Sequence, residues 1–375
     1  MKHYCIYSSV FLILISCRQK SDSIELYCPT IQVNIENVST LKMEDIATLH
    51  SIIPLHTSDD LLIGNIGKVV FSDSSIIVWD SQMKSVLLFD VQGKYKYNIG
   101  TKGNGPNEYT GVYDMYVNPE TNRIYLLDEP ARRIFEYDMD GRILNVQQSS
   151  YYLYTILPVK DGCYGVNSCQ NENKYDLIFL DSTLKHIKTG YFPFKVRLPL
   201  CLSNNFTENE KQELFYHYSY SDTIYKMENN KPVPFIAIDF GNKKNPVQNM
   251  NTESFKKQIE SGEYVGRINN VYVYNEKIFF SFSDFHGFGK PSIPYHCMVT
   301  ADVNNIQSIV YNRIAPPKEV PVDHSSEILG LSSGKLIYQI IPGILPEKVL
   351  NLLKNAGFEN LESDSNPVLI VYKLK

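Results

Sequence analysis

An internal repeat with a period of 48 residues is the feature that most constrains the fold of this chain. Three pairs of turn residues share this spacing: Asp80 and Asp128, Asp90 and Asp138, and Gly93 and Gly141. In both copies they punctuate short apolar runs, so each copy reads as short strands separated by turns. A repeat of about 40–50 residues built from short strands is typical of a propeller blade. The sequence therefore predicts an all-β fold of the β-propeller type.

Four further pairs of strand-like runs continue the pattern to the C-terminus. They lie at 163–166 with 177–181, 214–218 with 223–227, 271–274 with 278–282, and 336–340 with 368–372. Together with the two clear copies they predict a six-bladed propeller over residues 50–375. The strand-like segment 51–55 has no blade of its own, and we expect it to complete the last blade, because an unpaired edge would be a liability. Minor helical insertions are expected at 252–261 and 346–356.

The composition supports strands and excludes one class of partner. The chain has 27 Tyr and 18 Phe against one Trp, which favours strands, and its hydrophobic content of 43% indicates a globular protein. The net charge of −5 argues against a nucleic-acid partner, because such proteins usually show basic patches.

The N-terminus has the layout of an export signal. Lys2 precedes a mostly apolar run from Tyr4 to Ile15, which is shorter than the about 20 residues that cross a bilayer. Leu14-Ile15-Ser16-Cys17 resembles the bacterial lipoprotein processing signal, which implies cleavage before Cys17 and lipid on this cysteine. We therefore expect a signal peptide at 1–16, a lipid-anchored tether at 17–40 and the propeller at 41–375. The expected location is the cell envelope, at the outer membrane, on a face that the sequence leaves open.

The cysteines allow two interpretations. Five of the seven remain once Cys5 leaves with the signal and Cys17 carries lipid, so at least one thiol has no intramolecular partner. Cys163 and Cys169 would bridge if they lay on neighbouring strands. The alternative, which we favour, is that all five are buried thiols, because a large core needs no covalent staple.

The segment Ile99–Tyr109, which contains Gly100, Gly103 and Gly105, resembles the interblade loop of a known family. This family comprises the six-bladed β-propeller lipoproteins of gut Bacteroidetes, an NHL-like group. Further similar segments are Phe89-Asp90-x-x-Gly93-Lys94, Ser221–Tyr225, Asn366–Tyr372, Ile53-Pro54-Leu55 and Leu62-Ile63-Gly64. At Asn107 the family pattern has a glycine, and Asn tolerates a left-handed backbone. The resemblance spans nearly the whole mature chain and implies a propeller on a lipid anchor. It brings no established activity, so it transfers no catalytic residue.

Two loops supply candidate ligand-binding residues. Glu108 and Tyr109 end the glycine-rich loop, where a carboxylate near the channel mouth would contact a ligand; a turn-capping role for Glu108 is the alternative. His286 and His296 flank a second glycine-rich loop. Gly330-Leu331-Ser332-Ser333-Gly334 matches the serine-hydrolase pattern, but a strand follows it, so we interpret it as a hairpin turn.

Four aspartates near strand ends are candidate metal ligands: Asp80, Asp114, Asp128 and Asp284. Six-bladed lactonases hold calcium in the central tunnel with such oxygens, which suit a hard cation. The shared repeat position of Asp80 and Asp128 favours a structural role in turns instead. A metal site would require these aspartates and Glu108 to converge on one centre.

We expect a binding or scaffold protein rather than an enzyme, because a propeller presents loops from every blade on one face. Its partner would be a glycan, a peptide or an envelope protein, with the membrane contacted through lipid on Cys17. The alternative is a metal-dependent hydrolase or lyase with calcium in the tunnel; otherwise we expect no cofactor. A structural subunit of an envelope complex is a third hypothesis, which predicts a large exposed apolar patch.

Overall fold

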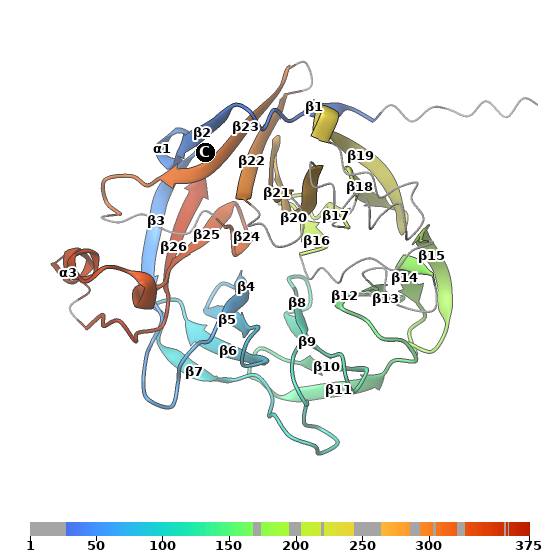
Figure 1. Ribbon diagram of the computed structural model, residues 1–375. Coiled ribbons are helices and arrows are strands. Elements are labelled where there is room, and N and C mark those ends of the chain that lie inside the picture. Colours follow the sequence, from blue (N-terminus) through green and yellow to red (C-terminus); the bar gives the residue numbers. More distant parts are fainter. Residues whose placement is uncertain are drawn as a thin grey trace, which may run out of the picture.

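The structure is a computed structural model. It describes residues 28–167, 174–194, 204–218, 221–243, 264–285, 293–302, 305–320, 327–355, 358 and 360–375. Within these residues, six β-sheets stand around a central axis, and each runs from the axis to the rim (Figure 1). The protein is a six-bladed β-propeller, as the repeat and the further strand pairs predict.

The first three blades follow the chain from the innermost strand outward. Blade 1 contains β4 (Ile66–Phe71), β5 (Ser75–Asp80), β6 (Ser85–Asp90) and β7 (Tyr95–Asn98). Blade 2 contains β8 (Asp114–Asn118), β9 (Arg123–Asp128), β10 (Arg133–Tyr137) and β11 (Ile143–Gln148). Blade 3 contains β12 (Thr155–Val159), β13 (Gly162–Val166), β14 (Tyr175–Leu180) and β15 (Ile187–Pro193).

Each of the last three blades takes its outermost strand from the N-terminal part of the chain. Blade 4 contains β16 (Phe206–Glu208), β17 (Leu214–Tyr216), β18 (Thr223–Glu228), β19 (Lys231–Asp239) and β1 (Thr30–Gln32). Blade 5 contains β20 (Tyr264–Tyr274), β21 (Lys277–Phe285), β22 (Ile293–Asp302), β23 (Asn305–Ala315) and β2 (Val38–Lys42). Blade 6 contains β24 (Gly330–Ser332), β25 (Lys335–Ile340), β26 (Val368–Leu374) and β3 (Ala47–Pro54).

The ring closes in blade 6. β3 pairs antiparallel with β26 from Ala47 opposite Leu374 to Pro54 opposite Val368. The first described part of the propeller thus completes the sheet formed by the last, which confirms the closing role predicted for segment 51–55. Because β3 covers the edge of β26, that strand has a partner on each side.

The N-terminal strands β1 and β2 differ from the sequence-based expectation. β1 and the first three residues of β2 fall within the segment 17–40 that we expected to be a tether, yet β1 pairs in parallel with β19 and β2 in parallel with β23. The physical reason is that the last strands of blades 4 and 5 have open edges, and an extended chain passing along the rim satisfies their backbone groups. The expected signal peptide and Cys17 lie outside the described residues and stay predictions.

The core lies between neighbouring blades. Every residue of β5 is buried, because a middle strand is covered on both faces and therefore reads as a continuous apolar run. Ile77 and Trp79 of blade 1 pack in one cluster with Phe135 of blade 2. The indole Nε1 of Trp79 donates to the carbonyl oxygen of Val112 at 3.0 Å, so the contact between these blades is also hydrogen-bonded.

Helices are minor additions to this ring. α3 (Glu347–Asn355) follows η3 (Pro342–Ile344) between β25 and β26, and it packs Leu350 and Leu353 on the core of blade 6. This confirms the insertion expected at 346–356, whereas the one expected at 252–261 lies outside the described residues. The short α1 (Met43–Ile46) precedes β3, and η1 (Gly241–Lys243) follows β19. Among the described helices, none has the length and apolar character needed to cross a membrane.

Three cysteines fall in the described part of the chain, and all three are free thiols. Cys163 and Cys297 are buried and Cys28 is half-buried. Burial raises the pKa of Cys163 to about 12, so this thiol stays protonated at neutral pH. Cys169, the partner considered for Cys163, lies outside the described residues.

Candidate functional site

Strand register divides each blade into two ends. β4 runs from Ile66, opposite Asp80, to Phe71, opposite Ile76. Asp80 therefore lies at one end of blade 1 and Phe71 at the other. We call the end where the chain enters the inner strands the entry face, and the opposite end the exit face.

Asp80 fastens two loops of the entry face. Its fully buried carboxylate accepts hydrogen bonds from the backbone N–H groups of Gly64 at 2.7 Å and Asn65 at 3.2 Å, just before β4. It also accepts from the N–H groups of Gln82 and Met83, both at 2.9 Å, in the turn after β5. Four donors occupy the acceptor sites of one carboxylate, so Asp80 acts as a loop cap in this structure.

Asp128 repeats this arrangement in blade 2. Its buried carboxylate accepts from the backbone N–H of Thr110 at 2.8 Å and from the hydroxyl of Thr110 at 2.6 Å. Nη2 of Arg133 lies 3.3 Å from Oδ2 of the same carboxylate, the oxygen that also accepts from the N–H of Thr110. Asp80 and Asp128 thus share a structural role as well as a repeat position, which is the role that their spacing favours.

Asp114 links three blades near the central axis. The carboxylate lies at the start of β8 and forms an ion pair with Nζ of Lys68 on β4, at 2.8 Å. Its second oxygen accepts from the backbone N–H of Ile156 on β12 at 2.9 Å. Because β4, β8 and β12 are the inner strands of blades 1, 2 and 3, this buried carboxylate ties those strands together.

The described carboxylates do not converge on one centre. Asp80, Asp114 and Asp128 have separate hydrogen-bond partners, and Asp284, on β21 opposite Val265, has a side chain outside the described set. Among the side chains that the structure describes, no group of three or more His, Cys, Asp or Glu residues is arranged to hold a metal. The described residues therefore lend the calcium hypothesis no support.

The glycine-rich loop of blade 2 is held by its own groups. The backbone N–H of Gly105 donates to Oε2 of Glu108 at 2.8 Å, and Nη2 of Arg133 donates to the carbonyl oxygen of Glu108 at 2.7 Å. Glu108 therefore has the turn-capping role that the sequence analysis gave as the alternative to ligand binding. Tyr109 is 1% exposed and meets Phe135 edge-on, and burial raises its pKa to about 12. Its ring belongs to the core here.

His296 lies inside blade 5 on β22. It is 9% exposed, and its ring stacks on Tyr311 with 5.5 Å between centroids. Burial lowers its pKa to about 4, so it is neutral at neutral pH. This gives His296 a packing role in the described structure, while His286 lies outside the described residues.

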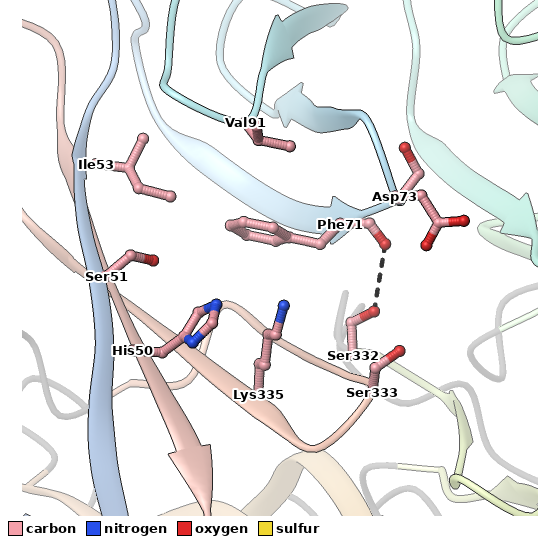
Figure 2. Close-up of a pocket in the computed structure, with 10 residues that line it drawn as sticks. His50, Ser51, Ile53, Phe71, Asp73, Val91, Ser332, Ser333 and Lys335 are labelled. Atoms are coloured by element: carbon pink, nitrogen blue, oxygen red, sulfur yellow. Dashed lines mark hydrogen bonds between the residues drawn. The ribbon is translucent and has the colours of Figure 1, made fainter.

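A cavity of about 460 Å³ lies on the exit face between blade 6 and blade 1, as Figure 2 shows. We call it the seam cavity, because the first and last blades meet there. Its size falls within the usual range for small-molecule sites. The lining residues come from β3, β4 and the turn after it, the turn after β6 and the β24–β25 hairpin: His50, Ser51, Ile53, Phe71, Ser72, Asp73, Val91, Ser332, Ser333 and Lys335.

A β-bulge presents His50 in the wall of this cavity. Leu49 pairs with Tyr372 and Ser51 pairs with Val371, so His50 is the extra residue between two consecutive pairs. A bulge turns the side chain of its extra residue away from the regular alternation, and such bulges are frequent next to functional sites. Burial first, and then the charges of Lys335 and Lys373, lower the pKa of His50, so its imidazole is neutral at neutral pH.

A tight hairpin forms the second wall. Ser332 and Lys335 lie directly opposite each other on β24 and β25, which places both side chains on one face. Ser333 and Gly334 between them have φ of 49° and 71°, the left-handed values of a two-residue hairpin turn. The serine-hydrolase-like motif is thus a turn, as its following strand predicts. The hydroxyl of Ser332 donates to the carbonyl oxygen of Phe71 at 3.4 Å, a bond between blades that Figure 2 marks.

The polar groups of the seam cavity contrast with those of the entry face. Among the described residues, no hydrogen bond or ion pair engages the imidazole of His50, the carboxylate of Asp73 or the ammonium of Lys335. Phe71, Ile53 and Val91 add an apolar surface beside them. The seam cavity therefore combines free polar groups with an apolar wall, which is the usual composition of a ligand site.

Sequence reasoning missed this site. His50 and Lys335 lie near opposite ends of the chain and meet only because β3 closes the ring. The one signal in the sequence was the Ser333-Gly334 turn, which predicts a hairpin and brings Ser332 and Lys335 together. Nothing local to His50 predicts a bulge.

One family model matches most of the chain. The family described as "Domain of unknown function (DUF4934)" matches residues 28–373. No curated protein matches the chain at the level of sequence.

Two solved structures share the architecture. One is a protein of Bacteroides fragilis NCTC 9343 that is named as an exported protein, with a TM-score of 0.71, 15% identity, and coverage of 92% of this chain and 99% of that one. The other is a member of the duf4221 family from Bacteroides vulgatus, with a TM-score of 0.57, 10% identity, and coverage of 88% and 98%. At these identities the similarity shows the shared fold.

Proposed function

Because the chain belongs to the family described as "Domain of unknown function (DUF4934)", whose description names no activity, we propose a function from the site itself. The protein is a binding propeller that holds part of a glycan, peptide or envelope protein in the seam cavity and does not transform it chemically. The observation that carries this proposal is the free polar set of His50, Asp73 and Lys335 beside Phe71 in a cavity of ligand size.

Two lines support a location in the cell envelope. The similar protein of Bacteroides fragilis is named as an exported protein, and the N-terminal sequence up to Cys17 has the order of a lipoprotein signal. In a bacterial host, the protein should incorporate radiolabelled palmitate, and Cys17→Ala should not. Cys28→Ala is the matched control, and equal labelling of both variants would contradict lipid attachment at Cys17.

The binding function is tested by ligand screening with a variant of the cavity. The purified protein is screened against glycans and peptides by the shift of its melting temperature, and each hit is quantified by calorimetry. Phe71→Ala removes the aromatic wall and should weaken a bound ligand by about tenfold or more, since burying an aromatic side chain contributes about 1.5–3 kcal/mol. Tyr152→Ala, a change at an exposed aromatic in blade 3, is the control. Ligands that bind both variants equally do not occupy the seam cavity.

A further inference from the structure

One lysine of the seam-cavity lining, Lys335, faces a second lysine on the neighbouring strand. Lys335 on β25 lies directly opposite Lys373 on β26. Directly opposed side chains share one face of a sheet, and like charges in that arrangement are destabilising. Among the described residues, neither ammonium forms an ion pair that would offset this repulsion.

The same two lysines act on the imidazole at the bulge. Their positive charges, together with burial, lower the pKa of His50, which places all three side chains within electrostatic reach of one another. The neutral imidazole offers one donor and one acceptor next to the two cations. In the lining itself, Asp73 on the turn after β4 balances the charge of Lys335. Lys373 lies opposite Lys335 on the neighbouring strand, so positive charge is concentrated at the β25–β26 side of the cavity.

The rest of the lining favours a hydroxylated ligand body. Ser51, Ser72, Ser332 and Ser333 bring four hydroxyl groups, and Asp73 brings acceptor oxygens. Phe71 offers an aromatic face to C–H groups of a ring. A body with many hydroxyls engages these groups better than an apolar one, since unpaired polar groups would lose hydrogen bonds to water.

We propose that the seam cavity binds a small ligand with a carboxylate on a hydroxylated ring, a sugar of the uronic-acid type. The carboxylate lies against Lys335, and Lys373 adds positive charge from the neighbouring strand. His50 donates to or accepts from the ligand beside this carboxylate, and the ring packs on Phe71. This inference rests on the binding function proposed above and names the ligand class of that same site.

The test compares an acidic sugar with its neutral counterpart. Purified full-length protein is titrated with D-glucuronate and with D-glucose by calorimetry. Glucuronate should bind at least about tenfold more tightly, which is the gain of a charge-assisted hydrogen bond. Lys335→Gln should abolish this preference, and Lys335→Arg should keep most of it. Lys348→Gln, on the exposed face of α3, is the matched control and should change nothing.

The design separates loss of binding from loss of folding. Because Lys335 repels Lys373, Lys335→Gln should melt at the same temperature as the parent protein or higher. Equal affinity for glucose and glucuronate, or an unchanged preference in Lys335→Gln, overturns the inference. Binding of a peptide through its free C-terminal carboxylate, without binding of glucuronate, also overturns it.

The failure of the proposed function gives a different result. If neutral glycans or peptides bind and Phe71→Ala weakens them, the binding function stands and only the ligand class proposed here is wrong. If no member of the whole panel distinguishes the parent protein from Phe71→Ala, the seam cavity is not the binding site, and both proposals fall.

Discussion

At the residue scale, some of the described carboxylates accept hydrogen bonds that hold the fold together, and others accept none from the described residues. Asp80 accepts four backbone N–H groups while fully buried, whereas Asp73 in the seam cavity has no such bond among the described residues. A carboxylate whose acceptor sites are full has little capacity for a ligand. A position beside a strand end does not separate the two kinds, and the one sequence signal for the structural role of Asp80 is its repeat position, which it shares with Asp128.

Because Asp80 caps two loops, we expect an isosteric substitution of this residue to lower the stability of the protein strongly. Asp80→Asn replaces one acceptor oxygen by an NH₂ group that faces N–H donors, and should lower the free energy of unfolding by about 2–4 kcal/mol. Asp90→Asn, at the exposed turn where Asp90 accepts from Gln92 and Lys94, should cost about 1 kcal/mol or less. Urea unfolding measures both. Equal costs would show that Asp80 is not the cap described here.

The buried histidines predict a loss of stability in mild acid. Burial lowers the pKa values of His217 and His296 to about 4, and an unfolded histidine titrates near about 6.5. Between these values the unfolded state binds a proton that the native state does not, so the free energy of unfolding falls as the pH drops from about 6.5 to about 4. Each histidine contributes on the order of 3 kcal/mol to this fall.

The contribution of His296 is separable by substitution. His296→Phe keeps a ring stacked on Tyr311 and removes the titrating group, so the variant should lose less stability between pH 7 and pH 5 than the parent protein. Urea unfolding at several pH values measures the slope. His56→Gln, a change of an exposed histidine, should leave the slope unchanged. An unchanged slope in His296→Phe would contradict the low pKa.

At the scale of elements, the repeat allows a comparison of the same glycine turn in blade 1 and in blade 2. Gly93 and Gly141 occupy equivalent turns and both have positive φ, 87° and 76°. A Cβ at Gly141 would lie 2.9 Å from a side chain, the ring of Tyr97, whereas a Cβ at Gly93 would collide with the backbone carbonyl of Pro54 on β3. The same turn is therefore more constrained where it abuts the strand that closes the ring.

This difference predicts unequal effects of one substitution. Gly141→Ala should lower the free energy of unfolding by about 1 kcal/mol, the usual penalty for a left-handed backbone at a residue with a Cβ. Gly93→Ala should lower the free energy of unfolding by about 3 kcal/mol or more, because β3 must shift and its pairing with β26 weakens. Thermal and urea unfolding of the two variants provide the comparison. Similar costs would mean that the contact between Gly93 and β3 is not rigid.

At the scale of the whole molecule, the N-terminal part of the chain joins three blades. β1, β2 and β3 lie on the outer edges of blades 4, 5 and 6 in turn, which Figure 1 shows as the blue chain along the rim. Consecutive blades in a propeller are otherwise joined by one connection each. The segment therefore adds a second, independent link between blades 4, 5 and 6, and its last strand forms part of the seam cavity.

We expect metals to leave the melting temperature of the protein unchanged. The candidate metal ligands Asp80, Asp114 and Asp128 serve as structural hydrogen-bond acceptors. The melting temperature should be the same with calcium, with zinc and with a chelator, because these carboxylates already have protein donors. A rise with calcium that a chelator reverses would place an ion in the fold and would favour the hydrolase hypothesis. Differential scanning fluorimetry of the full chain measures this.

The sequence by itself determined the number of blades and most of their strands. The 48-residue repeat, the alternation of apolar runs with Asp and Gly turns, and the unmatched segment 51–55 are local patterns, and the formation of strands and turns depends mainly on such patterns. The strands β1 and β2 were missed because they are short and lie at the rim, so that only the neighbouring edges of β19 and β23 make them strands.

Only the tertiary structure decided where the site lies. The bulge at His50 depends on how β3 pairs with β26, and Lys335 reaches the same cavity through a hairpin of the last blade. Of the residues nominated from the sequence, Asp80, Asp128 and Glu108 hold loops in the described structure. Asp114 links three blades, and Tyr109 and His296 pack in the interior. A residue type and its position in a strand set what a side chain can do, but the partners that ring closure brings to it decide what remains free for a ligand.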